Sequence, residues 1–129
     1  MDMKQQRFGI EIELTGIARK RGAEIAAAYF GTQSYYEGTY YDTYVALDSQ
    51  GREWKFMSDA SIKPERKEGK SRVAASDSYK TEMVSPICRY EDIETIQELV
   101  RKLREAGALA NSSCGIHVHI DASPFDART

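Results

Sequence analysis

The chain has 129 residues, of which 41% are hydrophobic and 29% charged, and its formal net charge is −2. This length suits one domain with a core that needs no disulfides, and the near-neutral charge gives no basis for binding nucleic acid through bulk electrostatics. No apolar run approaches the ~20 residues of a membrane span, and no signal-peptide pattern opens the chain. Because Cys88 and Cys114 are the only cysteines, too few for a disulfide framework, we expect a reducing, cytoplasmic location. The charge and the apolar runs lead us to expect neither a nucleic-acid nor a membrane partner.

The first half of the chain predicts a strand, a helix and a hairpin. Apolar and polar residues alternate over 7–14 (RFGIEIEL), as is typical of a half-buried strand. A helix is predicted over 17–30, with Thr15 as its N-cap and Gly31 as its stop. The tyrosine-rich run YYEGTYYDTY is interpreted as a loop, and 44–56 (YVALDSQGREWKF) as two strands around a Ser-Gln-Gly turn.

The second half predicts an exposed loop, two strands and the clearest helix. The charged run 63–78 contains Pro, Gly and Ser without an apolar period, which indicates a loop. Strands are predicted over 79–84 and 115–121, and an apolar stripe at helical spacing predicts a helix over 91–106. We therefore expect a single α+β domain: a curved, mainly antiparallel sheet of four to five strands with two helices packed on one face.

The last predicted strand, within NSSCGIHVHID, holds both histidines of the chain. Residues one apart on a strand point the same way, so His117, His119 and Asp121 share one face. The other face is apolar, and we expect its isoleucines and valine to pack in the sheet. Cys114, just before this strand, could be a thiol ligand or nucleophile, although a small buried residue at the strand start is the preferred interpretation.

Carboxylates occupy the polar faces of the other predicted strands. Glu11 and Glu13 stand side by side on the first strand, where they repel each other unless a cation lies between them. Glu82 lies inside a short strand, and Asp59 shares a face with Lys55 opposite two aromatic residues. Each carboxylate alone could belong to a solvated face. Together with imidazole, such a set favours Mg²⁺ or Mn²⁺, whereas a structural zinc site would need more sulfur and nitrogen.

Four segments, taken in order, resemble the signature of the amidoligase family: FGIEIEL, WKFMSDASI, TEMVSPI and CGIHVHID. That family is related to glutamine synthetase and the glutamate–cysteine ligases, the carboxylate–amine ligase superfamily. The resemblance implies a partial glutamine synthetase-like catalytic core with a metal–ATP site on the sheet face opposite the helices. It also implies the reaction, in which ATP phosphorylates a carboxylate and an amine attacks the acyl phosphate to form an amide.

The resemblance also implies roles for individual residues. Glu11 and Glu13 match the family's metal-binding Glu-x-Glu, Glu82 matches a further metal-ligand acid, and His117 matches the histidine that joins a second metal. His119 matches the position that approaches the ATP phosphates, as a catalytic and cofactor-binding residue.

Three further residues complete the predicted site. Asp59 matches an acidic position to which we give a catalytic role, and Lys55 and Lys80 are the candidate cations for binding the nucleotide. The expected cofactors are Mg²⁺ or Mn²⁺ and ATP. The expected partners are small-molecule or peptide carboxylate and amine substrates.

One departure from the superfamily pattern concerns the region after the His-x-His strand, from which relatives supply arginines and another acid. We therefore expect either the N-terminal part of a longer family domain or a minimal form that completes its site in a homo-oligomer. We expect the isolated monomer to bind metal with little turnover. Two alternatives stay open: a metal-dependent hydrolase that uses the His-x-His and the carboxylates, and a non-catalytic fragment that binds metal or nucleotide.

Overall fold

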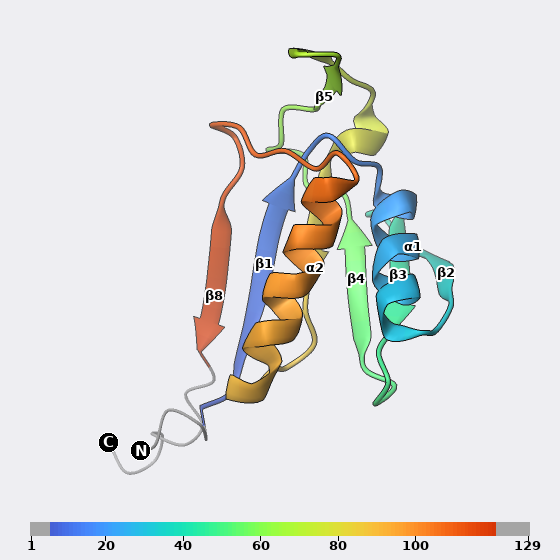
Figure 1. The fold of residues 1–129 in the computed structure, drawn as a ribbon, viewed down its shortest axis with the longest axis vertical. Coiled ribbons are helices and arrows are strands. Elements are labelled where there is room, and N and C mark those ends of the chain that lie inside the picture. Colours follow the sequence, from blue (N-terminus) through green and yellow to red (C-terminus); the bar gives the residue numbers. More distant parts are fainter. Residues whose placement is uncertain (1–5, 121–129) are drawn as a thin grey trace.

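The computed structural model describes residues 6–120, which form an open six-stranded sheet, a separate hairpin and two α-helices (Figure 1). In chain order the elements are β1 (Phe8–Leu14), α1 (Arg19–Phe30), β2 (Ser34–Gly38), β3 (Thr43–Leu47), β4 (Glu53–Met57), β5 (Glu65–Glu68), β6 (Ser71–Ala74), β7 (Thr81–Val84), α2 (Ile93–Glu105) and β8 (Ile116–Ile120). The strand order in the large sheet is β2-β3-β4-β7-β1-β8, and every neighbouring pair is antiparallel. The strands that carry Glu11 and Glu13, Glu82, and the two histidines (β1, β7 and β8) therefore lie in one sheet.

The predicted α+β class, mainly antiparallel sheet and two helices are confirmed, whereas the predicted number of strands is too low. The missed strand in the large sheet is β2, which begins the tyrosine-rich run. Its polar composition suggested a loop, but tyrosine favours a half-buried pleated surface. The run 63–78, predicted as a loop, instead contains the β5–β6 hairpin and the short 3₁₀ helix Asp77–Tyr79.

Helix α1 begins two residues later than predicted, and its N-cap is Ala18 rather than Thr15. The Thr15 side chain is buried, and its Oγ1 donates to the carbonyl of Glu65 (2.9 Å) and accepts from the N–H of the same residue (2.8 Å). Thr15 therefore holds the β5 segment against the end of β1, and the predicted N-cap is wrong. The predicted stop is confirmed, since Gly31 takes the left-handed conformation with φ of 73°.

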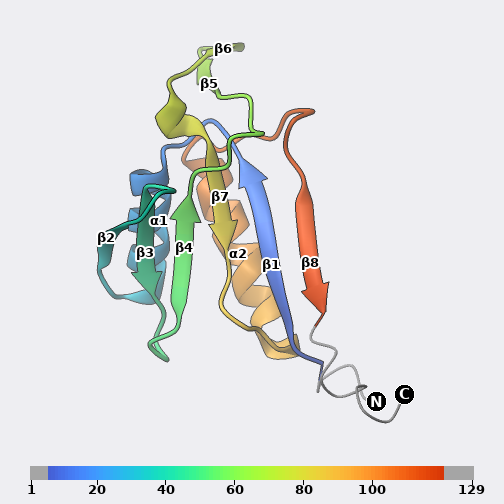
Figure 2. The same ribbon diagram turned by 180° about the vertical axis from the view of Figure 1, so that it is seen from behind.

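Both helices pack on one face of the sheet and leave the other face uncovered (Figures 1 and 2). The core between the two layers contains Ile12, Leu14, Ala23, Ala26, Trp54, Phe56, Met83, Ile96, Leu99 and Leu103. Gly22 brings α1 close to β4, because a Cβ at this position would lie 2.8 Å from Phe56 Cδ2. None of the helices within residues 6–120 is long and apolar enough to cross a membrane.

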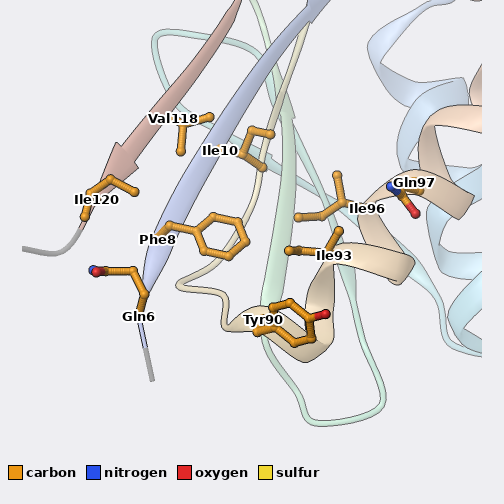
Figure 3. Close-up of a pocket in the computed structure, with 9 residues that line it drawn as sticks. All are labelled: Gln6, Phe8, Ile10, Tyr90, Ile93, Ile96, Gln97, Val118 and Ile120. Atoms are coloured by element: carbon orange, nitrogen blue, oxygen red, sulfur yellow. The ribbon is translucent and has the colours of Figure 1, made fainter. Parts of the chain in front are cut away.

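The helices stop short of β8, which contradicts the expected packing of its apolar residues. Ile116, Val118 and Ile120 are 64%, 54% and 56% exposed on the helix side of the sheet. Figure 3 shows the adjoining hollow of about 320 Å³ between β1, β8 and the start of α2. The lining side chains include neither carboxylate, amine nor imidazole, so this hollow lacks the groups that the predicted chemistry needs.

Candidate metal centre

Strand register brings the predicted acids together on the uncovered face of the sheet. Glu13 lies opposite Glu82 in the β1–β7 pair, and Glu11 lies opposite His117 in the β1–β8 pair. Residues paired across antiparallel strands project to the same face. This is the face turned toward the viewer in Figure 2, with both helices behind it. Asp59 follows the end of β4, the strand on the other side of β7.

The side chains form two groups whose potential ligand atoms lie within 4.8 Å of one another. One group contains Glu11, Glu82 and His117, and the other contains Glu13, Asp59 and Glu82. Glu82 belongs to both and therefore connects them. Asp59, predicted to be catalytic, has its carboxylate grouped with those of two predicted metal ligands.

Backbone and hydroxyl donors orient the more buried group. The N–H of Gly115 donates to Glu13 Oε1 at 2.7 Å. Ser61 donates from its N–H to Asp59 Oδ1 (2.9 Å), and its Oγ lies 2.7 Å from the same oxygen and 3.5 Å from Glu13 Oε2. Sequence reasoning missed Gly115 and Ser61. The Asp-x-Ser spacing could have indicated Ser61, because Asp and Ser side chains at this spacing form local turns. Gly115 acts through its backbone N–H, so its residue type gives no indication of its role.

Crowding of carboxylates changes their ionisation. Burial, followed by the charges of Glu11, Asp59 and Glu13, raises the pKa of Glu82 to about 7. The hydrogen bond between Glu13 and Asp59 raises the pKa of Glu13 and lowers that of Asp59. Bringing these carboxyls together therefore opposes the ionisation of Glu82 and Glu13, and a bound divalent cation would favour it.

The two imidazoles extend the centre toward the edge of the sheet. His119 Nε2 lies 3.2 Å from Glu11 Oε1, and His117 Nδ1 lies 3.7 Å from the same oxygen. Both rings are exposed on β8. His117 is within reach of Glu82 and joins the first group, while His119 contacts Glu11 from outside it.

The structure does not bring the two candidate cations into either group. Lys55 Nζ forms ion pairs with Glu37 Oε1 (3.3 Å) and Glu53 Oε1 (3.7 Å), on the part of the open face away from β1. Lys80 Nζ pairs with Asp77 Oδ1 at 3.2 Å. Their assignment to the nucleotide stays a prediction.

Cys114 is only half-buried and precedes β8, with its Sγ 3.5 Å from Asn111 Oδ1. This corrects its interpretation as a buried residue at the strand start.

The donor chemistry fits a hard divalent cation. Four carboxylates and one imidazole converge in two overlapping groups, and oxygen-rich sets of this kind suit Mg²⁺ or Mn²⁺. Among residues 6–120, Glu11 pairs with the two histidines, and none of the four acids forms an ion pair with lysine or arginine. Within these residues, therefore, no lysine or arginine ion pair relieves the repulsion among the acids.

An open antiparallel sheet with carboxylates and imidazoles gathered on its uncovered face defines a candidate metal-dependent protein of the α+β class. Residues 4–129 match the family model described as "putative amidoligase enzyme", and the chain belongs to that family. The resemblance drawn from the four sequence segments is thus confirmed. Comparisons with curated proteins and with solved structures gave no significant match, and the likeness to the glutamine synthetase core stays a prediction.

Proposed function

We propose that this protein is an ATP- and divalent-metal-dependent carboxylate–amine ligase. Membership of the amidoligase family supports an amide-forming ligase. The observation that carries the finer proposal is the sharing of Glu82 between two groups of potential metal ligands on one sheet face. Phosphoryl transfer commonly needs divalent ions that neutralise the phosphate charge and align the reacting oxygens.

The residues divide into two ligand sets. Glu11, Glu82 and His117 would hold one Mg²⁺ or Mn²⁺ ion, and Glu13, Asp59 and Glu82 would hold a second. Bound divalent ions supply electrostatic stabilisation of the nucleotide phosphates. Gly115 and Ser61 keep the carboxylates of the second set in place through the hydrogen bonds described above.

The remaining predicted residues act on the nucleotide. His119, whose Nε2 lies 3.2 Å from Glu11 Oε1, would donate a hydrogen bond to a phosphate oxygen. Lys55 and Lys80 would exchange their carboxylate partners for phosphate oxygens. In the reaction, a substrate carboxylate oxygen attacks the γ-phosphorus and ADP leaves. The amine nitrogen then attacks the acyl carbon, phosphate leaves, and the nitrogen loses a proton to give the amide.

The test is a single-turnover assay with stoichiometric radiolabelled ATP, Mg²⁺, a panel of carboxylates, and hydroxylamine as a small nucleophile. We expect ADP to form together with a hydroxamate, which mass spectrometry detects even when turnover is slow. Glu82→Gln should abolish both products, whereas Glu24→Gln, an exposed change on α1, should not. Release of ADP and free phosphate without any carboxylate-derived product, in the whole panel, would contradict the ligase proposal.

A further inference from the structure

Two tyrosines form an exposed corner in the turn between β2 and β3. The rings of Tyr40 and Tyr41 are 95% and 53% exposed. Their centroids lie 5.4 Å apart and their planes meet at 83°. In this edge-to-face arrangement both rings remain exposed to solvent, and exposed aromatic rings are a stacking surface for a planar group.

The turn that carries this corner is held in an unfavourable backbone conformation. Thr39 and Asp42 have φ values of 68° and 51°, in the left-handed region that residues other than glycine rarely adopt. Asp42 Oδ2 accepts from Nε (3.1 Å) and Nη2 (2.7 Å) of the buried Arg19. Thr39 Oγ1 lies 2.9 Å from the hydroxyl of Thr43 and accepts the N–H of Tyr41 at 3.2 Å. Such conformations persist where surrounding contacts enforce them, and they concentrate at functional sites.

Hydrogen bonds place the corner beside the candidate metal centre. The carbonyl of Tyr41 accepts the N–H of Ser58 at 2.9 Å, and the next residue is Asp59. Arg19, which holds Asp42, also donates from Nη1 to the carbonyl of Lys80 at 2.7 Å, two residues before Glu82. Figure 2 shows the β2–β3 turn at the same end of the sheet as the end of β4 and the start of β7.

We propose that Tyr40 and Tyr41 are the stacking platform for the base of the nucleotide whose phosphates meet the metal centre. This inference rests on the proposed function. The platform suits a neutral planar ring better than an ammonium group, because the carboxylate next to it in the chain, Asp42, is already engaged by Arg19 and by the hydroxyl of Tyr36 at 2.8 Å. Stacking contacts the flat face that every base has. The platform therefore favours nucleotides over inorganic phosphates without selecting strongly among bases.

The experiment compares Mg²⁺–ATP with Mg²⁺–tripolyphosphate by isothermal titration of the whole chain. The two ligands share the phosphate chain and differ in the nucleoside. We expect the wild type to bind ATP about tenfold more tightly or better. The double variant Tyr40→Ala/Tyr41→Ala should lose that preference without changing the affinity for tripolyphosphate. Tyr40→Phe/Tyr41→Phe should keep it, since the ring faces remain.

The control is Tyr90→Ala, which changes an exposed tyrosine at the hollow on the helix side and should leave both affinities unchanged. Equal affinity of the wild type for the two ligands would overturn this inference and leave the proposed function standing. The same holds if the alanine variant retains the wild-type preference for ATP. Failure of both ligands to bind in the presence of Mg²⁺ would overturn the proposed function and this inference together. Circular dichroism of each variant checks that the exposed substitutions leave the fold intact.

Discussion

At the scale of single residues, Glu82 has the most consequential position because both potential ligand groups include its carboxylate. It lies on β7 between the acids of β1 and the end of β4, and its burial among them raises its pKa to about 7. A carboxyl with a raised pKa is protonated over a pH range in which an ordinary glutamate is ionised. Metal binding must displace that proton.

Metal affinity should therefore depend on pH through Glu82. Below its pKa of about 7, a cation competes with the proton, so the apparent affinity for Mn²⁺ should rise by up to about tenfold per pH unit and level off above the pKa. Titration calorimetry at pH 5.5, 6.5, 7.5 and 8.5, in buffers of different ionisation enthalpy, measures both the affinity and the released proton. An affinity that stays flat from pH 5.5 to 7.5 would contradict this ionisation.

Much of the candidate site could be predicted at the residue scale, because a strand repeats every two residues. The two-residue period of a strand is enough to predict that Glu11 and Glu13 share one face of their strand, and that His117 and His119 share one face of theirs. The proximity of Asp59 to Glu13 depends on β4 and β1 lying on either side of β7, an arrangement that no local pattern encodes. The ion pairs of Lys55 depend on Glu37 in the missed strand β2, so the surroundings of this lysine could not be predicted either.

At the scale of elements, the close approach of α1 to β4 depends on the missing side chain of Gly22. Alanine is the better helix former by about 1 kcal/mol. A Cβ at Gly22 would nevertheless lie 2.8 Å from the buried ring of Phe56. We expect Gly22→Ala to lower the free energy of unfolding by about 1–3 kcal/mol, as overpacking does. Urea denaturation measures the change, with the exposed Lys20→Ala on α1 as the control. Stabilisation by Gly22→Ala would show that the interface relaxes freely.

The exposed apolar face of β8 gives a second prediction at this scale. Val118 is 54% exposed, whereas Leu99 of α2 is fully buried. Val118→Thr should change the free energy of unfolding by less than about 0.5 kcal/mol, and Leu99→Ala should lower it by about 2–5 kcal/mol. Thermal and urea unfolding of the two variants provide the comparison. A cost for Val118→Thr as large as that for Leu99→Ala would show that this face of β8 is covered in solution.

The elements that could be predicted were those with a strong internal period. The alternation in β1 and the apolar stripe of α2 fix the type of each element through burial on one side. Strand β2, with three largely polar exposed residues, takes its conformation from pairing with β3, and such tertiary pairing leaves little local pattern. Thr15 similarly suited an N-cap, but the distant Glu65 backbone supplies partners for its hydroxyl that the sequence cannot reveal.

At the scale of the whole molecule, strand order assembles the centre from residues far apart in the chain. Strands β4, β7, β1 and β8 are consecutive in the sheet, so acids from the first strand meet a carboxylate from β7 and an imidazole from the last strand described. The helices supply the core from the opposite face and leave the acidic face uncovered. This division explains how four carboxylates and one imidazole can approach one another beside a stable sheet.

The central claim is that Glu82 is shared between two metal positions, and a Mn²⁺ titration followed by electron paramagnetic resonance tests it most directly. We expect two ions per chain at saturation. Glu11→Gln should weaken one of them and Asp59→Asn the other, each by more than about tenfold, while Glu82→Gln should weaken both. Glu24→Gln on α1 should weaken neither. The absence of Mn²⁺ binding to the wild type at millimolar concentration, or a Glu82→Gln variant that binds as the wild type does, would contradict the claim.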